Sequence, residues 1–287
     1  MPELPEVETI VRNLRQGNEE HPPLIGHTIE KIELLWQRTL AMPIPEELKN
    51  TLPGQVIRGL WRRGKFIVIE LDKNYLLIHL RMSGDLRMET SQLADASLRP
   101  VELHDRALFY LNNGWRLAFN DPRKFGRIWL VQEPAEVLGA LGPEPLEENF
   151  TAQLLYKQLK SVRRQLKPLL LDQRFLAGLG NIYTDEALHL AGLHPLLHSN
   201  QLNEEQAERL WGAIRNVLKE GIRHNGTSID WIYRGGNFQS RLRVYGRTGE
   251  PCLICGTTIQ RMVIGQRSTH FCPRCQPANC ATIKQVV

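Results

Sequence analysis

The spacing of apolar residues divides the chain into a strand-rich first half and a helix-rich second half. In the first half, alternating or continuously apolar runs of the kind that form strands occur at 56–70, 74–88 and 106–121. The Asn113-Gly114 pair inside the last run predicts a tight hairpin. We therefore expect an antiparallel sandwich or barrel over about residues 1–132, preceded by a short helix at about 5–16.

The second half follows the period of helices. Residues 141–150 are rich in proline, glycine and acidic side chains, which indicates a linker. Beyond them, apolar residues recur at three- and four-residue spacing near 151–160, 166–173, 181–191 and 203–224. The last helix begins Asn203-Glu-Glu-Gln, which is similar to a capping box. From about residue 240 the pattern becomes short and strand-like.

Composition excludes a membrane-spanning protein. The 287 residues suit two to three domains, and 42% of them are hydrophobic, which is enough to form real cores. No stretch approaches the ~18–20 consecutive apolar residues of a membrane helix. The N-terminus also lacks a basic region followed by an apolar run. We expect a soluble cytoplasmic protein with no membrane partner.

Four cysteines have the spacing of a metal site. Cys252, Cys255, Cys272 and Cys275 form a C-x2-C-x16-C-x2-C pattern. This pattern is typical of one structural zinc ion, because four thiolates complete its tetrahedron and leave no position open for water. Disulfides are the alternative, which a reducing compartment disfavours. Cys280 is left over, and we expect it to be a free thiol.

Positive charge is concentrated around these cysteines. The chain carries a net charge of +5, and residues 234–275 contain seven arginines, no lysine and one acid, so the rest is close to −1. A basic segment on a near-neutral body favours a polyanionic partner. Arg261 and Arg267 lie between the cysteine pairs, where a metal-clamped hairpin would hold an arginine against a phosphate. A solvated basic face, or a finger with a purely structural role, is the alternative.

Two loops combine cations with an apolar side chain. In DPRKFGR (121–127), Arg123 and Lys124 adjoin Phe125, an arrangement that suits insertion into a base stack with the cations on phosphates or base edges. In HLRMSG (79–84), Met82 is a second apolar filler, although a lone methionine is more often a core residue. The cationic run RRGK (62–65) is a third candidate, whose alternative is a solvated strand edge.

A glycine-rich turn precedes one of the expected helices. In Gly178-Leu-Gly180-Asn181, glycine lets the backbone approach a ligand, and the next helix's first N–H groups would face an anion. Asn181 adds side-chain amide protons, and we expect Lys167, in the turn before the preceding helix, near the same phosphate. A glycine that merely ends a helix is the alternative.

The first residues carry the candidate chemistry. Removal of the initiator methionine would leave Pro2 with a free secondary amine. An α-amino group has a pKa of about 7.7–8.0 against about 10.4 for lysine, so about a tenth of it is neutral at pH 7, versus roughly 0.04% of an unperturbed lysine. This difference favours Pro2 as a nucleophile toward an aldehyde-like sugar carbon. Glu3 could protonate the sugar oxygen, and Glu6 could contact the base.

The motifs, taken in order, resemble the bacterial formamidopyrimidine-DNA glycosylases, of the family that also includes endonuclease VIII. They are PELPEVET, RMSG, DPRKFG, LGPEPL, GLGNIY, VYGRTGEPC and the four-cysteine finger, and they cover nearly the whole chain. The resemblance implies an α+β multidomain protein with an N-terminal β-sandwich and flanking helices, a helix–two-turn–helix domain and a C-terminal β-hairpin zinc finger. The implied divisions are 2–134, a linker at 135–150, 151–233, a base-recognition loop and connector at 234–246, and the finger at 247–287.

The resemblance also implies an activity. Such an enzyme excises 8-oxoguanine and formamidopyrimidines from duplex DNA and then cuts the strand by β- and δ-elimination. Pro2 would attack C1′, Glu3 would be the general acid, and Glu6 would contact the flipped base. The family's phosphate contacts match Lys65, which also counts among the catalytic residues, with His79, Asn181 and Arg267. Its stack-filling residues match Met82, Arg123 and Phe125, while Lys124 and Lys167 are DNA contacts expected from the residues alone.

Two alternatives stay open. Endonuclease VIII-type enzymes prefer oxidised pyrimidines and typically begin PEGPE, whereas this chain has PELPE. The second alternative is a non-catalytic zinc-finger DNA-binding protein, which would leave Pro2, Glu3 and Glu6 unexplained. A chain that keeps Met1 would nevertheless behave as such a protein, because its Pro2 amine would be blocked. Residues 227–246 are a few residues short of the family's base-recognition loop, so the lesion preference stays open. We expect a monomer, associated with the nucleoid through duplex DNA that contains oxidised bases or abasic sites.

Overall fold

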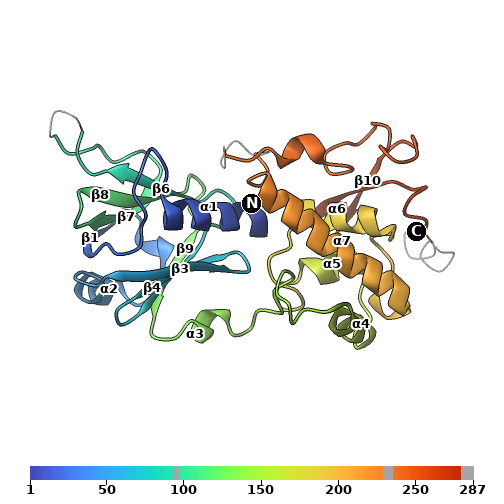
Figure 1. Cartoon of the computed structure of the whole chain (residues 1–287), viewed down its shortest axis with the longest axis horizontal. Helices are drawn as coiled ribbons and strands as arrows, with labels where there is room; N and C mark the ends of the chain where they lie inside the picture. Colours follow the sequence, from blue (N-terminus) through green and yellow to red (C-terminus); the bar gives the residue numbers. More distant parts are fainter. Residues whose placement is uncertain (94–96, 229–234, 279–287) are drawn as a thin grey trace. The chain divides into compact units, whose positions relative to one another are not determined.

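The chain folds into two compact units (Figure 1). The computed structural model describes residues 1–93, 97–228 and 235–278. The first unit consists mainly of residues 1–140, and the second mainly of residues 141–227 and 236–278. Within the described ranges, no helix combines the length and the apolar character that crossing a bilayer requires.

Two β-sheets form the frame of the first unit. One has the strand order β1 (Ile29–Leu34), β7 (Asp105–Leu111), β8 (Trp115–Asn120) and β6 (Asp85–Thr90), and all its neighbours are antiparallel. The other has the order β2 (Leu40–Met42), β9 (Arg127–Val131), β5 (Tyr75–His79), β4 (Phe66–Leu71) and β3 (Ile57–Arg63). The expected antiparallel arrangement is correct except at one edge, where β2 pairs with β9 in parallel.

One apolar core joins both sheets to the first helix, α1 (Leu4–Gln16). The helix contributes the apolar positions Val7, Ile10, Val11 and Leu14, whose spacing places them on one face. The predicted hairpin links β7 to β8, and Gly114 at its turn has a φ of +77°, where a residue without a Cβ avoids strain. Three short helices, η1 (Gln37–Thr39), α2 (Pro45–Thr51) and α3 (Ala135–Leu138), also belong to this unit, and the pattern of apolar residues did not predict them.

Helices dominate the second unit. Beyond α3 (Ala135–Leu138) lie α4 (Ala152–Lys160), α5 (Leu166–Leu171), α6 (Asn181–Ala191), η2 (Ser199–Gln201), α7 (Glu204–Arg223) and η3 (Phe238–Arg241). The four longer ones match the expected helical segments. The expected capping box at α7 is present, since Asn203 Oδ1 accepts the Gln206 N–H at 2.8 Å and Gln206 Oε1 accepts the Asn203 N–H at 3.0 Å. A two-stranded hairpin of β10 (Gln260–Ile264) and β11 (Arg267–Phe271) follows.

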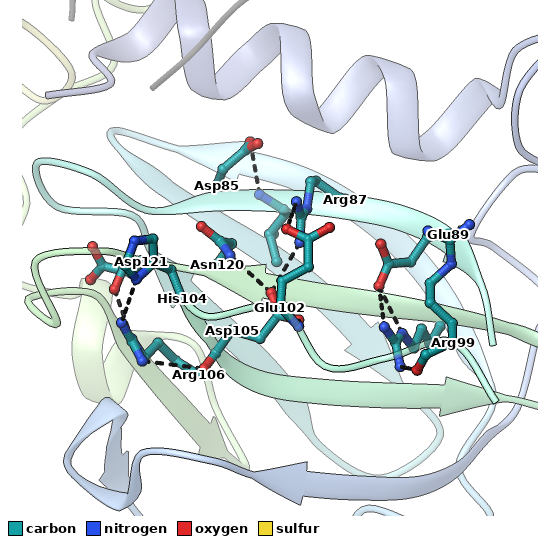
Figure 2. A network of polar contacts seen from close by, with 12 residues as sticks. Asp85, Arg87, Glu89, Arg99, Glu102, His104, Asp105, Arg106, Asn120 and Asp121 are labelled. Carbon is teal, nitrogen blue, oxygen red and sulfur yellow. Dashed lines mark hydrogen bonds and ion pairs between the residues drawn. The ribbon is translucent and has the colours of Figure 1, made fainter. Parts of the chain in front are cut away.

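A polar network braces the β6–β7–β8 sheet (Figure 2). Arg87 donates to Glu102 Oε2 at 2.6 Å and to Asp105 Oδ1 at 3.0 Å, and Asn120 Nδ2 donates to the same Asp105 oxygen at 2.9 Å. Arg106 Nε donates to the backbone carbonyl of Asp121 at 2.7 Å. The network therefore fixes the end of β8, which leads directly into the loop 121–126.

A buried arginine closes the other end of this sheet. The Arg116 side chain is 1% exposed, and its Nε donates to Glu89 Oε1 at 2.7 Å. Its Nη atoms donate to the carbonyls of Arg99 and Pro100 at 3.0 and 2.9 Å. Replacing one partner of such a buried pair leaves the other charge and the two carbonyls without their donors.

We therefore expect Arg116→Met to destabilise the first unit by about 3–5 kcal/mol. This corresponds to a drop of roughly 6–20 °C in the midpoint of that unit's thermal unfolding, measured by its tryptophan fluorescence. The matched control is Arg58→Met, because the Arg58–Asp72 pair is exposed and such pairs contribute at most about 1 kcal/mol. Equal midpoints for the two variants would contradict this prediction.

Candidate functional site

The first residues of the chain are held by a capping box. Glu3 is the N-cap of α1, and Glu6 Oε2 accepts the Glu3 backbone N–H at 2.8 Å, completing the reciprocal pattern. Pro5 lies in the first turn, where a missing N–H leaves no helical hydrogen bond unmade. Pro2 is buried, and Glu3 and Glu6 are each only 2% exposed. The sequence suggested only chemical roles for the two acids; the structure adds that they order the terminus.

The turn that carries Lys65 is tied to α1. Arg62, near the end of β3, donates through Nε to Glu8 Oε2 of the helix at 3.0 Å and through Nη1 to the Gly64 carbonyl at 3.2 Å. Burial alone would raise the pKa of Glu8, but the charges and hydrogen bonds of Arg62 and Arg12 outweigh it and lower this pKa. Lys65 itself is 5% exposed. The turn of Lys65 is therefore attached to α1, the helix that also orders the start of the chain.

His79 is held as a neutral ring. It pairs with Phe66 in the β4–β5 register, and its ring meets the Phe66 ring edge-on with the centroids 4.7 Å apart. Burial, followed by the charges of Arg81 and Lys65, lowers the pKa of His79 to about 3. Its Nδ1 accepts the Arg81 N–H at 2.9 Å, so the ring proton lies on Nε2. Nε2 is thus a neutral donor beside Lys65.

Asp121 shapes the loop that carries Phe125. This fully buried carboxylate accepts the Gly126 N–H at 2.7 Å and the Arg123 N–H at 3.2 Å. A side chain on Gly126 has no room, because its Cβ would lie 2.3 Å from Cζ of Phe119. Phe125 is consequently presented outward, 50% exposed, with the Arg123 guanidinium 5.1 Å from its ring centroid.

Ser83 joins this loop to the turn that carries Met82. Its hydroxyl donates to Asp121 Oδ1 and accepts the Arg123 N–H at 3.2 Å. Met82 itself is half-buried. Two loops that are about forty residues apart in the sequence therefore share one anchor.

Lys124 departs from the arrangement that its sequence position suggested. It has a φ of +61°, and its ammonium lies 4.2 Å from the ring centroid of Trp36. Arg123 is thus the cation that stacks on Phe125, while Lys124 points to a different aromatic residue. Adjacent side chains in a tight turn need not share a direction, so only Arg123 accompanies Phe125 here, and the DNA contact of Lys124 stays a prediction.

In the second unit, Asn181 opens α6 beside the hairpin. Its Nδ2 donates to the Ser268 carbonyl at 3.0 Å. Gly180 is the N-cap of the helix, and Gly178 has a φ of +93°, which favours glycine. Arg267 is exposed where β11 begins, directly after the turn that ends in Gln266. Asn181 and Arg267 therefore lie on neighbouring elements.

Lys167 is not exposed, contrary to the expectation from the sequence. It is the second residue of α5, its side chain is 0% exposed, and its ammonium bonds Asp185 Oδ1 at 2.5 Å and the Ser268 carbonyl at 2.8 Å. A buried lysine needs such partners because an isolated ammonium is too costly to desolvate. The phosphate role expected for its side chain is therefore replaced by contacts within the protein.

The cysteine sulfurs fit a tetrahedral zinc ion. The four Sγ atoms lie within 4.8 Å of one another, and the separations Cys255–Cys272, Cys255–Cys275 and Cys252–Cys275 are 3.5, 3.5 and 3.8 Å. Four sulfurs at about 2.3 Å from one zinc ion are separated by roughly 3.8 Å. These cysteines therefore suit a closed structural site. The free thiol expected at Cys280 lies outside the described residues.

The sequence analysis did not identify two buried side chains near the zinc finger, His189 and Glu186. His189 Nε2 lies 3.5 Å from Cys252 Sγ, a contact typical of the shell around a metal site. Glu186 accepts the backbone N–H groups of Arg243, Val244 and Tyr245 at 2.9–3.0 Å. Both lie on α6, and the sequence shows them only as polar residues within an apolar helix.

Residues 235–246 of the expected base-recognition loop are described; residues 229–234 are not.

Three stretches of the chain match domains of one family. Residues 1–128 match the formamidopyrimidine-DNA glycosylase N-terminal domain, residues 141–232 match the formamidopyrimidine-DNA glycosylase H2TH domain, and residues 249–278 match a zinc finger found in FPG and IleRS. The formamidopyrimidine-DNA glycosylase of Protochlamydia amoebophila is 44% identical over 285 residues, which cover 96% of this chain and 99% of that protein.

Solved structures give the same result. A complex between a Lactococcus lactis FPG mutant and DNA containing Fapy-dG matches with a TM-score of 0.86 and 38% identity, over 96% of this chain and 100% of that one. A structure of MutM with DNA containing carbocyclic 8-oxo-G matches with the same TM-score, identity and coverage. With its domains, full-length relatives and fold in agreement, the chain belongs to the formamidopyrimidine-DNA glycosylase family.

Proposed function

We propose that this protein is a bifunctional DNA glycosylase and abasic-site lyase that removes 8-oxoguanine and formamidopyrimidines from duplex DNA. The observation that carries the proposal is the ordered terminus, where a capping box fixes Glu3 and Glu6 beside a buried Pro2. Relatives that match 96% of the chain carry the name of this activity. Solved relatives were captured on DNA containing Fapy-dG or carbocyclic 8-oxo-G.

The chemistry begins once Met1 has been removed. The secondary amine of Pro2 attacks C1′ of the damaged nucleotide and displaces the base, which leaves with the electron pair of the glycosidic bond and takes up the proton that the amine loses; Glu3 then protonates the sugar ring oxygen, so the C1′–O4′ bond opens. The resulting iminium acidifies C2′, so β-elimination expels the 3′ oxygen and δ-elimination then expels the 5′ oxygen. Glu6, one turn along the helix, contacts the flipped base. These roles follow the family motif residue by residue.

Binding has to compensate for extracting the nucleotide. Unstacking a base costs a few kcal/mol, and an apolar wedge in the vacated space offsets part of this cost. Phe125, with Arg123 stacked on it, is exposed for that purpose, and Met82 lies on the neighbouring turn. In the same unit, Lys65 and the Nε2–H of His79 provide a cation and a neutral donor for a phosphate.

The second unit contributes further phosphate contacts. The side chain of Asn181 and the exposed Arg267 are proposed to hold the backbone of the extruded nucleotide. A zinc ion held by the four cysteines keeps the ends of the hairpin together.

A monomer suffices, because one chain supplies every proposed catalytic and phosphate-binding residue. We propose that it acts in the cytoplasm, at the nucleoid, with functional divisions at 2–134, 135–150, 151–233, 234–246 and 247–287.

Borohydride trapping tests the proposed function directly. On a duplex with 8-oxoguanine opposite cytosine, we expect a covalent protein–DNA adduct whose linked peptide begins at Pro2. A duplex carrying an oxidised pyrimidine should give less adduct. If correctly processed protein gives no adduct, the enzymatic proposal fails, and an adduct through Lys65 contradicts the mechanism. Protein that retains Met1 is the matched control, because its proline nitrogen is part of a peptide bond.

Glu3→Gln should separate chemistry from binding. Glutamine keeps the shape and the acceptor oxygen of the cap but cannot donate an acid proton, so we expect base removal to fall by at least about a hundredfold. Affinity for the damaged duplex, measured by fluorescence anisotropy, should stay within a few-fold of wild type. Glu19→Gln, at an exposed position, is the control. Normal base removal by Glu3→Gln would exclude Glu3 as the general acid.

Removing zinc should weaken DNA binding rather than the chemistry. Without the ion the hairpin loses its clamp, and one charge-assisted phosphate contact contributes roughly 1.5–3 kcal/mol, so we expect about a tenfold to hundredfold loss of affinity after chelation. Adding zinc back should restore binding. Arg267→Ala should lose a similar amount and become insensitive to chelation. Unchanged binding by the zinc-free protein would refute this role of the finger.

A further inference from the structure

The second unit contains a buried charge cluster that the proposed chemistry does not use. Lys167 from α5 and Asp185 from α6 form an ion pair with Nζ and Oδ1 2.5 Å apart, and both side chains are 0% exposed. Asp185 Oδ2 accepts the His270 backbone N–H at 2.9 Å and lies 3.2 Å from its ring Nδ1. One carboxylate thus binds both a neighbouring helix and β11.

The cluster ends at a single carbonyl oxygen. The Ser268 carbonyl accepts the Lys167 ammonium at 2.8 Å and the Asn181 amide at 3.0 Å. Ser268 directly follows Arg267, the exposed residue at the start of β11. Lys167 and Asn181 therefore donate to the same carbonyl, on the residue next to Arg267. This contact also fixes the side chain of Asn181, the second proposed phosphate-binding residue of the unit.

The geometry also fixes which way the Asn181 amide faces. Its Oδ1 is buried and has no hydrogen-bond partner within the described residues, while its Nδ2 faces the Ser268 oxygen. A reversed amide would bring two oxygens together, which is repulsive. An amide group has two N–H donors, so Nδ2 keeps a second N–H for an anion. The position of the Ser268 carbonyl therefore decides whether Asn181 can donate to a phosphate.

We infer that Lys167 and Asp185 are positioning residues, which clamp the hairpin so that Asn181 and Arg267 act as one fixed pair on the DNA backbone. The inference rests on the proposed function, because it assigns these two residues to phosphates. Instead of contacting a DNA phosphate directly, Lys167 would act through the positions of Asn181 and Arg267. The loss of one charge-assisted phosphate contact weakens binding by about tenfold to a hundredfold.

Asp185→Asn separates the two roles of Lys167. If Lys167 acts through the clamp, both Lys167→Met and Asp185→Asn should weaken binding to a duplex containing a tetrahydrofuran abasic analogue, by about tenfold to a hundredfold. If Lys167 contacts phosphate itself, Asp185→Asn releases its ammonium, and affinity stays the same or rises. That second result would overturn the inference. Lys157→Met, which removes an exposed lysine from α4, is the matched control and should bind like wild type.

A double-variant cycle gives a second readout that simple destabilisation would not change. Because Asp185→Asn already misplaces Arg267, adding Arg267→Ala should weaken binding by no more than about twofold further. Full additivity of the two losses would overturn the clamp. Zinc content and the unfolding midpoint are measured for every variant. Asparagine matches aspartate in shape, so the Asp185→Asn arm decides the matter if Lys167→Met fails to fold.

The outcome is distinguishable from failure of the proposed function. Borohydride adducts on abasic DNA should form with Asp185→Asn at saturating protein concentration, because Pro2 lies in the other unit and its amine is unchanged. Wild-type trapping together with wild-type binding by Asp185→Asn would overturn the clamp alone. No trapping by wild type would overturn the enzymatic proposal, while the binding arms would still report on the clamp.

Discussion

The capping box at the start of α1 is the interaction on which the first unit's proposed chemistry depends. Ordering a residue costs about 1–2 kcal/mol of backbone entropy, and chain ends usually lack the contacts to offset it. Here Glu6 accepts the Glu3 N–H, while Leu4 and Val7 are fully buried. A nucleophile one residue before the cap therefore inherits the rigidity of a packed helix, which an amine on a frayed end would lack.

Buried carboxylates hold the loops of both units in the same way. Asp121 accepts the Arg123 and Gly126 amides, Asp185 accepts the His270 amide, and Glu186 accepts the amides of residues 243–245. Each acid lies at the end of a strand or within a helix; Asp121 and Glu186 bind segments with little regular structure, whereas Asp185 binds strand β11 of the hairpin. A charged acceptor makes stronger hydrogen bonds than a neutral one, so one side chain can replace a missing backbone ladder. The exposed residues Phe125 and Arg267 are positioned by these hidden acids.

Sequence reasoning succeeded where the signal is local. The longer helices, the Asn113-Gly114 hairpin, the α7 cap and the cysteine spacing each depend on residues close together in the chain. It failed for Lys167, whose partners Asp185 and Ser268 are 18 and 101 residues away. Nothing in a single sequence distinguishes a lysine in an apolar helix that faces solvent from one that is buried against a distant carboxylate.

The net charge of a segment also does not show which of its arginines are available to bind DNA. The strongly positive balance of residues 234–275 favoured a polyanionic partner, with a solvated basic face as the alternative. Within it, Arg247 bonds Glu250 and the Pro251 carbonyl, and Arg261 bonds the Ser268 hydroxyl. Those guanidiniums are used in part to fold the finger, whereas Arg267 is exposed beside the turn. Phosphate recognition depends on where a guanidinium is held rather than on how many there are. The clamp beneath Ser268 therefore matters more to binding than the net charge of the segment that contains it.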